Sequence, residues 1–154
     1  MAASRKKEAK VSRCSTPRDR DPRAKSDPGS NRREKPAWSV GFADPEGPWG
    51  FKKLDCKSWW DDIYTKLCNF ETMTWQEIFD VSGGRSRGNN NHEIPVSDLA
   101  PLARRRLKEL HRDDIDILFS LRLTGRKRIW GILEGTVLRI LWYDPKHQVC
   151  PTSK

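Results

Sequence analysis

The chain has 154 residues, enough for one domain, and a formal net charge of +9. No segment approaches the roughly 18 consecutive apolar residues of a transmembrane helix, and the basic N-terminus lacks the apolar run of a secretory signal. The four cysteines and three histidines stand at no metal-ligand spacing, which argues against the common zinc motifs. We therefore expect a cytoplasmic protein with reduced thiols, no metal or other cofactor, and no membrane partner.

Most of the net positive charge lies in the first 36 residues. Residues 1–36 contain 12 Lys and Arg and 5 Asp and Glu, which leaves 18 basic and 16 acidic residues for the rest of the chain. The segment has no aromatic residue and almost no large aliphatic residue, so it cannot bury enough apolar surface to offset its ordering entropy. We predict a disordered basic tail over 1–36, either a solvated extension or an arm that binds phosphates, and one folded domain over 37–154. The net charge alone argues little for nucleic-acid binding.

Aromatic residues begin at Trp38. Gly and Pro over residues 38–49 indicate an ordered loop, and residues 50–54 are predicted as a short strand. Asp55 is a suitable N-cap for a helix over 55–71, whose apolar residues repeat at helical spacing. The residues of that apolar face are Trp60, Ile63, Tyr64, Leu67 and Phe70.

Two further helices are predicted before the chain turns to strands. Residues 74–77 match a capping box and predict a short helix up to about Phe79. A third helix is predicted over 98–111, with Asp98 as N-cap and Pro101 in the first turn, where its missing N–H costs nothing. The apolar face of this helix contains Leu99, Leu102, Ala103, Leu107 and Leu110.

The hydrophobic period changes from helical to extended after the third helix. Three strands are predicted, over 117–123, 128–133 and 137–143, with turns at Thr124-Gly125 and Glu134-Gly135. The last strand is almost wholly apolar, as expected for a central position, and Asp144-Pro145 ends it because Pro cannot donate to a sheet ladder. Helices followed by this meander predict an α+β domain, a twisted antiparallel sheet with two to three helices packed on one face.

The meander is rich in arginine and poor in acid. Arg122 and Arg128 flank its first turn, so we expect them to lie close together across the hairpin. A guanidinium stays charged, and its planar fork matches a phosphate. His147 follows the last strand, and a histidine can take and give a proton near neutral pH. Two cations beside a histidine suit attack of a ribose 2′-hydroxyl on the adjacent phosphate, which needs no metal.

Other basic residues are candidates for RNA contacts. They are Arg126, Lys127, Arg139 and Lys146 in the meander, and Arg85 and Arg87 in the Gly- and Asn-rich loop 82–91. Such a loop can present backbone N–H groups to a phosphate, or it can be a mobile connector. Arginines on a hairpin can likewise serve solubility alone.

Four short motifs follow one another in the meander. They are Ser120-Leu121-Arg122-Leu123, Lys127-Arg128-Ile129-Trp130, Val137-Leu138-Arg139-Ile140 and Tyr143-Asp144-Pro145-Lys146-His147. In this order and spacing they resemble the C-terminal half of the RelE/YoeB-type toxins of the RelE/ParE superfamily, over about residues 97–150. The resemblance implies a RelE-like fold and a metal-independent endoribonuclease (mRNA interferase), the toxin of a type II toxin-antitoxin system. Its implied partners are mRNA, typically on the ribosome, and a cognate antitoxin.

The resemblance also implies roles for individual residues. Arg128 resembles the arginine that binds the scissile phosphate, and Arg122 is a second candidate for that contact. His147 resembles the terminal histidine that transfers a proton. Tyr143 resembles the terminal aromatic residue that stacks on a base.

The chain departs from the family pattern at one position of the implied mechanism. The general-base Glu of YoeB-like members has no equivalent in residues 111–116, and Asp144 or His111 are the candidates to replace it. Two other functions remain open. One is a non-catalytic module that binds nucleic acid or an acidic protein through Arg122, Arg126, Lys127 and Arg128. The other is gyrase inhibition, as in the ParE branch of the same fold.

Overall fold

The computed structural model describes residues 30–81 and 90–151 and contains one five-stranded sheet. The strands are β1 (Ala37–Ser39), β2 (His92–Pro95), β3 (Ile117–Arg122), β4 (Arg128–Glu134) and β5 (Val137–Asp144). Their spatial order is β1-β5-β4-β3-β2. The three strands of the meander are therefore confirmed, whereas β1 lies in the predicted loop and the predicted strand at 50–54 is instead the 3₁₀ turn Phe51–Lys53.

The sheet is mixed, so the prediction of a wholly antiparallel sheet is wrong. β2, β3, β4 and β5 pair antiparallel, but β1 runs parallel to β5, with Trp38 opposite Leu138. A parallel pair needs a long connection between its strands. The helices, β2, β3 and β4 all lie between β1 and β5 in the chain and supply that connection.

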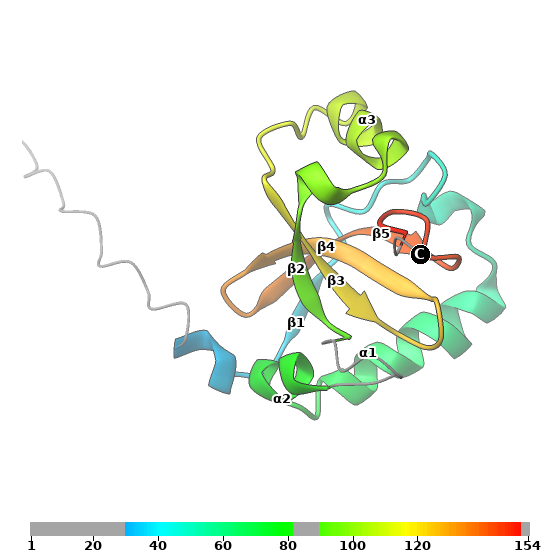
Figure 1. The fold of residues 1–154 in the computed structure, drawn as a ribbon. Helices are drawn as coiled ribbons and strands as arrows, with labels where there is room; N and C mark the ends of the chain where they lie inside the picture. The colour runs from blue at the N-terminus through cyan, green and yellow to red at the C-terminus, as the bar shows by residue number, and fades with distance from the viewer. Residues whose placement is uncertain (1–29, 82–89, 152–154) are drawn as a thin grey trace, which may run out of the picture.

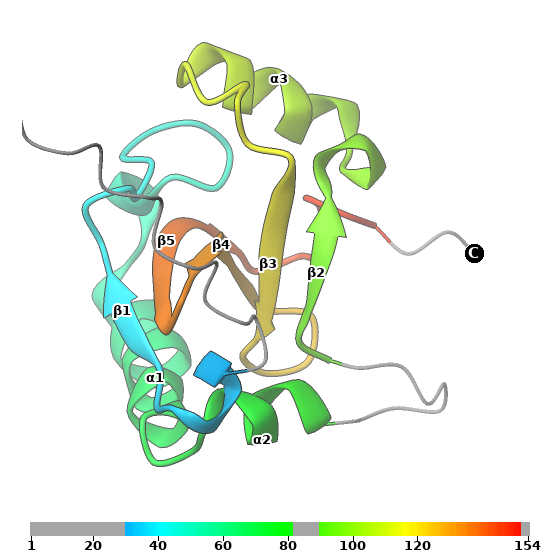
Figure 2. The ribbon, with the colours of Figure 1, turned by 90° about the vertical axis from the view of Figure 1, so that its left-hand side faces the viewer.

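Helices cover both faces of the sheet. They are the π-helical segment Ser58–Tyr64 running into α1 (Thr65–Phe70), then α2 (Trp75–Asp80) and α3 (Pro101–Glu109). In both ribbon views α3 lies on one side of the sheet and α1 and α2 lie on the other (Figures 1 and 2). The expectation of helices on one face is therefore wrong, because β5 and the middle of β4 are apolar on both faces and need two covers.

Two hydrophobic cores result. On the α1–α2 face, Trp75 packs edge-on against Phe119 with ring centroids 5.5 Å apart. On the α3 face, Trp142 packs against Trp49 at 5.3 Å. A bulge in β5 sends Leu141 and Trp142 to the same core, and it requires glycine at position 131, where a Cβ would lie 2.4 Å from a backbone oxygen.

The first helix shows the predicted cap but not the predicted face. Asp55 accepts a hydrogen bond from the backbone N–H of Ser58 at 2.8 Å, which confirms it as a cap. The π-helical turns then shift the side-chain register, so Ile63 and Leu67 are buried while Trp60 and Tyr64 are 55% and 47% exposed. Trp60 and Tyr64 therefore pack on each other at the surface, and not in the core as predicted.

Of the predicted N-caps of the second and third helices, one is confirmed and one is wrong. Thr74 and Glu77 form the predicted capping box at the start of α2, which is confirmed. The third helix begins at Pro101 after Ala100, and Asp98 belongs to the 3₁₀ turn Val96–Asp98 that precedes it. The N-cap prediction for Asp98 is therefore wrong, since the N–H of Ala100 is bound by the Val149 carbonyl instead.

The predicted tail reaches too far along the chain. Residues 30–36 belong to the folded domain, because Trp75 donates its backbone N–H to the Glu34 carbonyl at 3.0 Å and the Arg32 guanidinium lies 4.5 Å from the Phe79 ring centroid. Residues 1–29 lie outside the described part. In residues 30–81 and 90–151 no helix has the length and apolar character to cross a bilayer.

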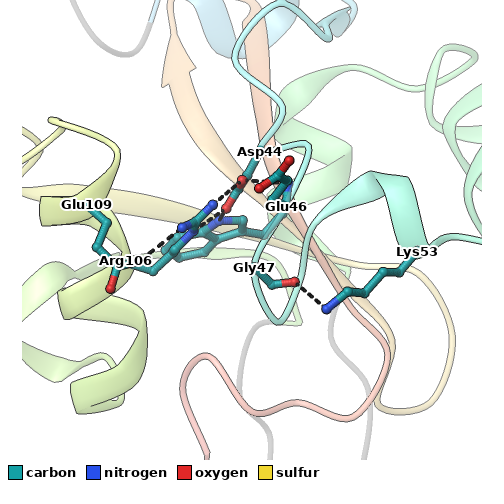
Figure 3. A network of polar contacts seen from close by, with 7 residues as sticks. Asp44, Glu46, Gly47, Lys53, Arg106 and Glu109 are labelled. Carbon is teal, nitrogen blue, oxygen red and sulfur yellow. Dashed lines mark hydrogen bonds and ion pairs between the residues drawn. The ribbon is translucent and has the colours of Figure 1, made fainter.

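A buried ion pair between Arg106 and Asp44 links α3 to the loop after β1. The Asp44 carboxylate is fully buried and accepts two bonds of 2.8 Å from Arg106, one of 3.1 Å from the Trp142 indole and one of 3.0 Å from the Glu46 N–H (Figure 3). Burial opposes ionisation of Asp44, but these bonds outweigh it and hold its pKa below the usual value. We assign this network to the fold, since every acceptor position of the carboxylate is used within the protein.

Candidate functional site

Arg122 and Arg128 lie together at the β3–β4 turn, as predicted. They are directly opposite in the antiparallel register. Arg122 Nε and Arg128 Nη1 donate to the same acceptor, the Gly125 carbonyl, at 3.1 Å and 3.0 Å. Gly125 has a φ of +53°, a conformation that favours glycine, and the predicted turn at Thr124-Gly125 is thereby confirmed.

Among the described residues, neither guanidinium forms an ion pair with a carboxylate. Burial and then the charge of Arg122 lower the pKa of Arg128 to about 10, while Asp144 raises it. Arg128 is thus cationic at neutral pH. No ion pair within the described ranges involves Arg122, Arg126 or Arg128. An anion bound here would relieve the repulsion between these like charges.

His147 follows a turn built on Asp144, the residue that lies opposite Arg128 in the β4–β5 register. The buried Asp144 carboxylate accepts the backbone N–H groups of Lys146, Gln148 and Val149 at 3.1, 2.6 and 2.8 Å. In this turn His147 has a φ of +60°, a left-handed conformation that a residue with a Cβ adopts only when its surroundings impose it. His147 as a whole is partly buried, and the turn fixes its backbone position.

The environment of His147 favours its neutral form. Burial lowers its pKa most, followed by the charge of Arg128, and Arg126 and Arg122 lower it further, while Asp144 raises it. The imidazole is therefore neutral at pH 7 and can accept a proton. We define the arginine–histidine cluster as Arg122, Arg126, Arg128 and His147. Arg126 is exposed in the turn, and Lys146 is exposed next to His147.

Tyr143 and Lys127 do not belong to this cluster. The Tyr143 ring is buried in the α1–α2 core, and its hydroxyl donates to Asp62 at 3.1 Å. Burial and the bond to Asp62 raise its pKa. Lys127 Nζ lies 2.6 Å from both oxygens of the same carboxylate. The predicted base-stacking role of Tyr143 is therefore contradicted, and Lys127 is neutralised by a residue that the sequence did not single out.

Two other predicted groups lie at the opposite end of the strands. Arg139 pairs with Ile132 in the β4–β5 register, forms an ion pair with Glu134 at 2.9 Å, and lies 4.6 Å from the Phe42 ring centroid. His111 lines the same hollow as Arg139. The structure therefore does not bring Arg139 or His111 to the cluster. Arg85 and Arg87 lie outside the described residues.

Asp144 cannot act as the missing general base in this arrangement. Its carboxylate is fully buried and accepts three backbone N–H groups, so no oxygen faces a substrate. Among the described residues, His147 is the one proton-transfer group that the fold places at the arginines. The sequence indicated the turn through Asp144-Pro145, but not the burial of the carboxylate.

Two asparagines that the sequence did not single out accept hydrogen bonds from Arg122. The Asn91 amide is buried, accepts the Arg122 backbone N–H at 2.8 Å and donates to the Ile78 carbonyl at 2.7 Å. The Asn90 side-chain oxygen accepts from Arg122 Nη1. They are the second and third residues of an Asn-Asn-Asn run, a composition that indicates a loop and gives no signal for this contact.

Inorganic phosphate is expected to raise the pKa of His147. A phosphate at the cluster would offset the three guanidinium charges that now oppose protonation. NMR titration of the His147 ring proton, with and without phosphate, measures this. Arg128→Gln should raise the pKa in the free protein and weaken the phosphate effect, whereas His111 should not respond. A His147 pKa that is insensitive to both changes would rule out anion binding at the cluster.

Comparison of the chain with protein-family models, with curated proteins and with solved structures finds no significant match to any of them. The interpretation of the cluster therefore depends on its geometry and charge.

Proposed function

We propose that this protein is an RNA-cleaving toxin of the RelE type, in which the arginine–histidine cluster binds the scissile phosphate of mRNA. The observation that carries the proposal is the pair Arg122 and Arg128, which share one acceptor and make no ion pair within the described ranges, next to the strand end that leads into His147. The nearby arginine charges also favour the neutral form of His147 by lowering its pKa. The partners proposed with it are mRNA on the ribosome and a cognate antitoxin.

The proposed chemistry needs only groups of the cluster and water. His147 accepts the proton of the ribose 2′-hydroxyl, and the 2′-oxygen attacks the adjacent phosphorus. Arg122 and Arg128 stabilise the negative charge that develops on the non-bridging oxygens. The bond from phosphorus to the 5′-oxygen breaks, and that oxygen takes a proton from water. The hydroxide formed then takes the proton held by His147, which returns the imidazole to its neutral form. The products are a 2′,3′-cyclic phosphate and a 5′-hydroxyl end.

A second candidate is a non-catalytic module that binds RNA through the same cluster. It is favoured by the burial of Tyr143 and of Asp144, which leaves His147 without a second proton-transfer group among the described residues. Loss of the leaving group would then be unassisted by the protein. This candidate requires the same phosphate contacts and differs only in the role of His147.

Expression of the wild type, Arg128→Ala and His147→Ala in bacteria tests the proposal. The wild type should arrest growth and create new mRNA 5′-ends, and both variants should lose these effects while accumulating as folded protein. Growth arrest with intact mRNA and accumulating DNA breaks would favour a gyrase-directed function. If the wild type neither arrests growth nor cleaves RNA, with or without ribosomes, the toxin proposal fails.

A further inference from the structure

A groove of about 460 Å³ adjoins the arginine–histidine cluster. It runs between the α1–α2 segment and the β3–β4 turn, and its volume lies in the roughly 300–1,000 Å³ range of small-ligand sites. The residues that matter for its chemistry are Lys66, Asn69, Phe70, Met73, Arg122 and Leu123.

Arg122 joins the groove to the cluster. Its guanidinium contacts the Gly125 carbonyl that Arg128 also contacts, and the Asn90 side chain holds it on the groove side. Thr124 and Gly125 line the groove as well, so one hairpin turn forms the boundary of both features. A nucleotide whose phosphate lies at Arg122 and Arg128 therefore has the group attached to that phosphate at the entrance of the groove.

The groove is lined by apolar side chains together with polar ones. Phe70, Met73 and Leu123 pack on the α1–α2 core, and Phe70 and Met73 remain partly exposed. Aromatic and thioether side chains are suitable surfaces for stacking of a base. Among the described residues, the groove lining contains no carboxylate, which would repel a nucleotide.

The rim carries donors that the protein does not use. In residues 30–81 and 90–151 the side chains of Lys66 and Asn69 make no hydrogen bond or ion pair, although Asp62 stands one helical turn before Lys66. That carboxylate is occupied by Lys127 and Tyr143. A lysine donates to the N7 and O6 acceptors of guanine, and an asparagine amide can donate and accept at a base edge.

We infer that this groove binds an unpaired purine base, with guanine favoured, of the RNA whose phosphate lies at the cluster. The inference rests on the proposed function, because it needs a phosphate at Arg122 and Arg128. It adds a base-recognition subsite in which Phe70 and Met73 stack on the purine, while Lys66 and Asn69 bind its edge.

Titration of the full chain with GMP, UMP and ribose 5-phosphate, followed by amide chemical shifts, tests the subsite. Ribose 5-phosphate carries the same phosphate but no base, so the ratio of its Kd to that of a nucleotide measures the base contribution. We expect GMP to bind about tenfold more tightly than ribose 5-phosphate, as one stacked base contributes on this scale. UMP should bind less tightly than GMP.

Two surface variants separate base binding from phosphate binding. Asn69→Ala and Lys66→Gln should reduce the advantage of GMP over ribose 5-phosphate severalfold. Lys57→Gln is the matched control, since it removes the same charge from the residue just before the π-helical segment, outside the groove. It should leave the ratio unchanged. Thermal unfolding of the three variants checks that each remains folded.

The outcomes distinguish the subsite from the proposed function. If GMP and ribose 5-phosphate bind equally, and Arg128→Gln weakens both, the base subsite is wrong and the phosphate site stands. Equal affinities for GMP and UMP overturn the purine preference. If neither GMP nor ribose 5-phosphate binds at millimolar concentration, both the subsite and the proposed phosphate site are wrong.

Discussion

His147→Ala is expected to slow RNA cleavage by about 10²–10⁴-fold, the range typical of a lost general acid or base. The Asp144 turn fixes the backbone of His147 close to the residue opposite Arg128, and the lowered pKa of His147 favours the neutral imidazole, which can accept a proton at pH 7. The arginines remain in the variant, so RNA affinity should change little. Single-turnover cleavage at saturating protein measures the rate without the binding step.

His111→Ala is the matched control for this experiment. It is the same substitution at a second histidine with a left-handed backbone, but one that lies with Arg139 at the far end of the strands. Its cleavage rate should equal that of the wild type. If His147→Ala also retains the full rate, His147 is not the base, and the non-catalytic binding module becomes the better interpretation.

Arg106→Gln is expected to lower the free energy of unfolding by about 2–3 kcal/mol. Removing one partner of a buried ion pair typically costs about 3–5 kcal/mol, and here the Asp44 carboxylate keeps its bonds to the Trp142 indole and the Glu46 N–H, which reduces the loss. Chemical denaturation at pH 7 measures the difference. Arg105→Gln is the control, because Arg105 is exposed on the same helix and should change stability by less than about 0.5 kcal/mol.

The effect of Arg106→Gln should depend on pH in a defined direction. The pKa of Asp44 is lowered in the folded protein, so its stabilising contribution is present above the ordinary Asp pKa of about 4. This contribution is lost as pH falls through the lowered folded-state pKa. The stability difference between wild type and variant should therefore shrink on acidification. A difference that is constant from pH 7 to pH 3 would show that the pair does not depend on an ionised Asp44.

Local patterns predicted the part of the fold that carries the cluster. Alternating and apolar runs separated by glycine turns specify β3, β4 and β5, and the short turn at Thr124-Gly125 is sufficient to place Arg122 opposite Arg128. Residues close in sequence were thus the ones placed correctly. His147 joined them because Asp144-Pro145 ends β5 beside the start of β4.

Contacts between residues far apart in sequence were not predictable in this way. β1 is three residues long, shows no alternation and pairs with β5 across most of the chain. Tyr143 stands near the end of the last strand, where an aromatic residue could face a ligand. Its hydroxyl instead points inward to Asp62 of the first helix, a contact that the sequence does not indicate. The π-helical segment displaced Trp60 and Tyr64, because a regular helical period cannot indicate where a helix widens.

The sequence of β5 also carries a sign that both faces of the sheet are covered. The run Val137–Tyr143 is apolar at nearly every position, which is typical of a strand covered on both sides. The apolar face of α3 can therefore pack on the sheet face opposite α1 and α2. Leu99, Ala103 and Leu107 pack there with Trp130 and Trp142.

Activation of a ribose 2′-hydroxyl by the cluster is tested most directly by removing that hydroxyl from the RNA. Purified protein is incubated with mRNA, free and on ribosomes, and the cleavage position is replaced by a single 2′-deoxynucleotide in a matched RNA. We predict cleavage of the all-ribose RNA, with 2′,3′-cyclic phosphate and 5′-hydroxyl ends, and no cleavage at the 2′-deoxy position. Equal cleavage of both RNAs, or no cleavage of either, would contradict the proposal.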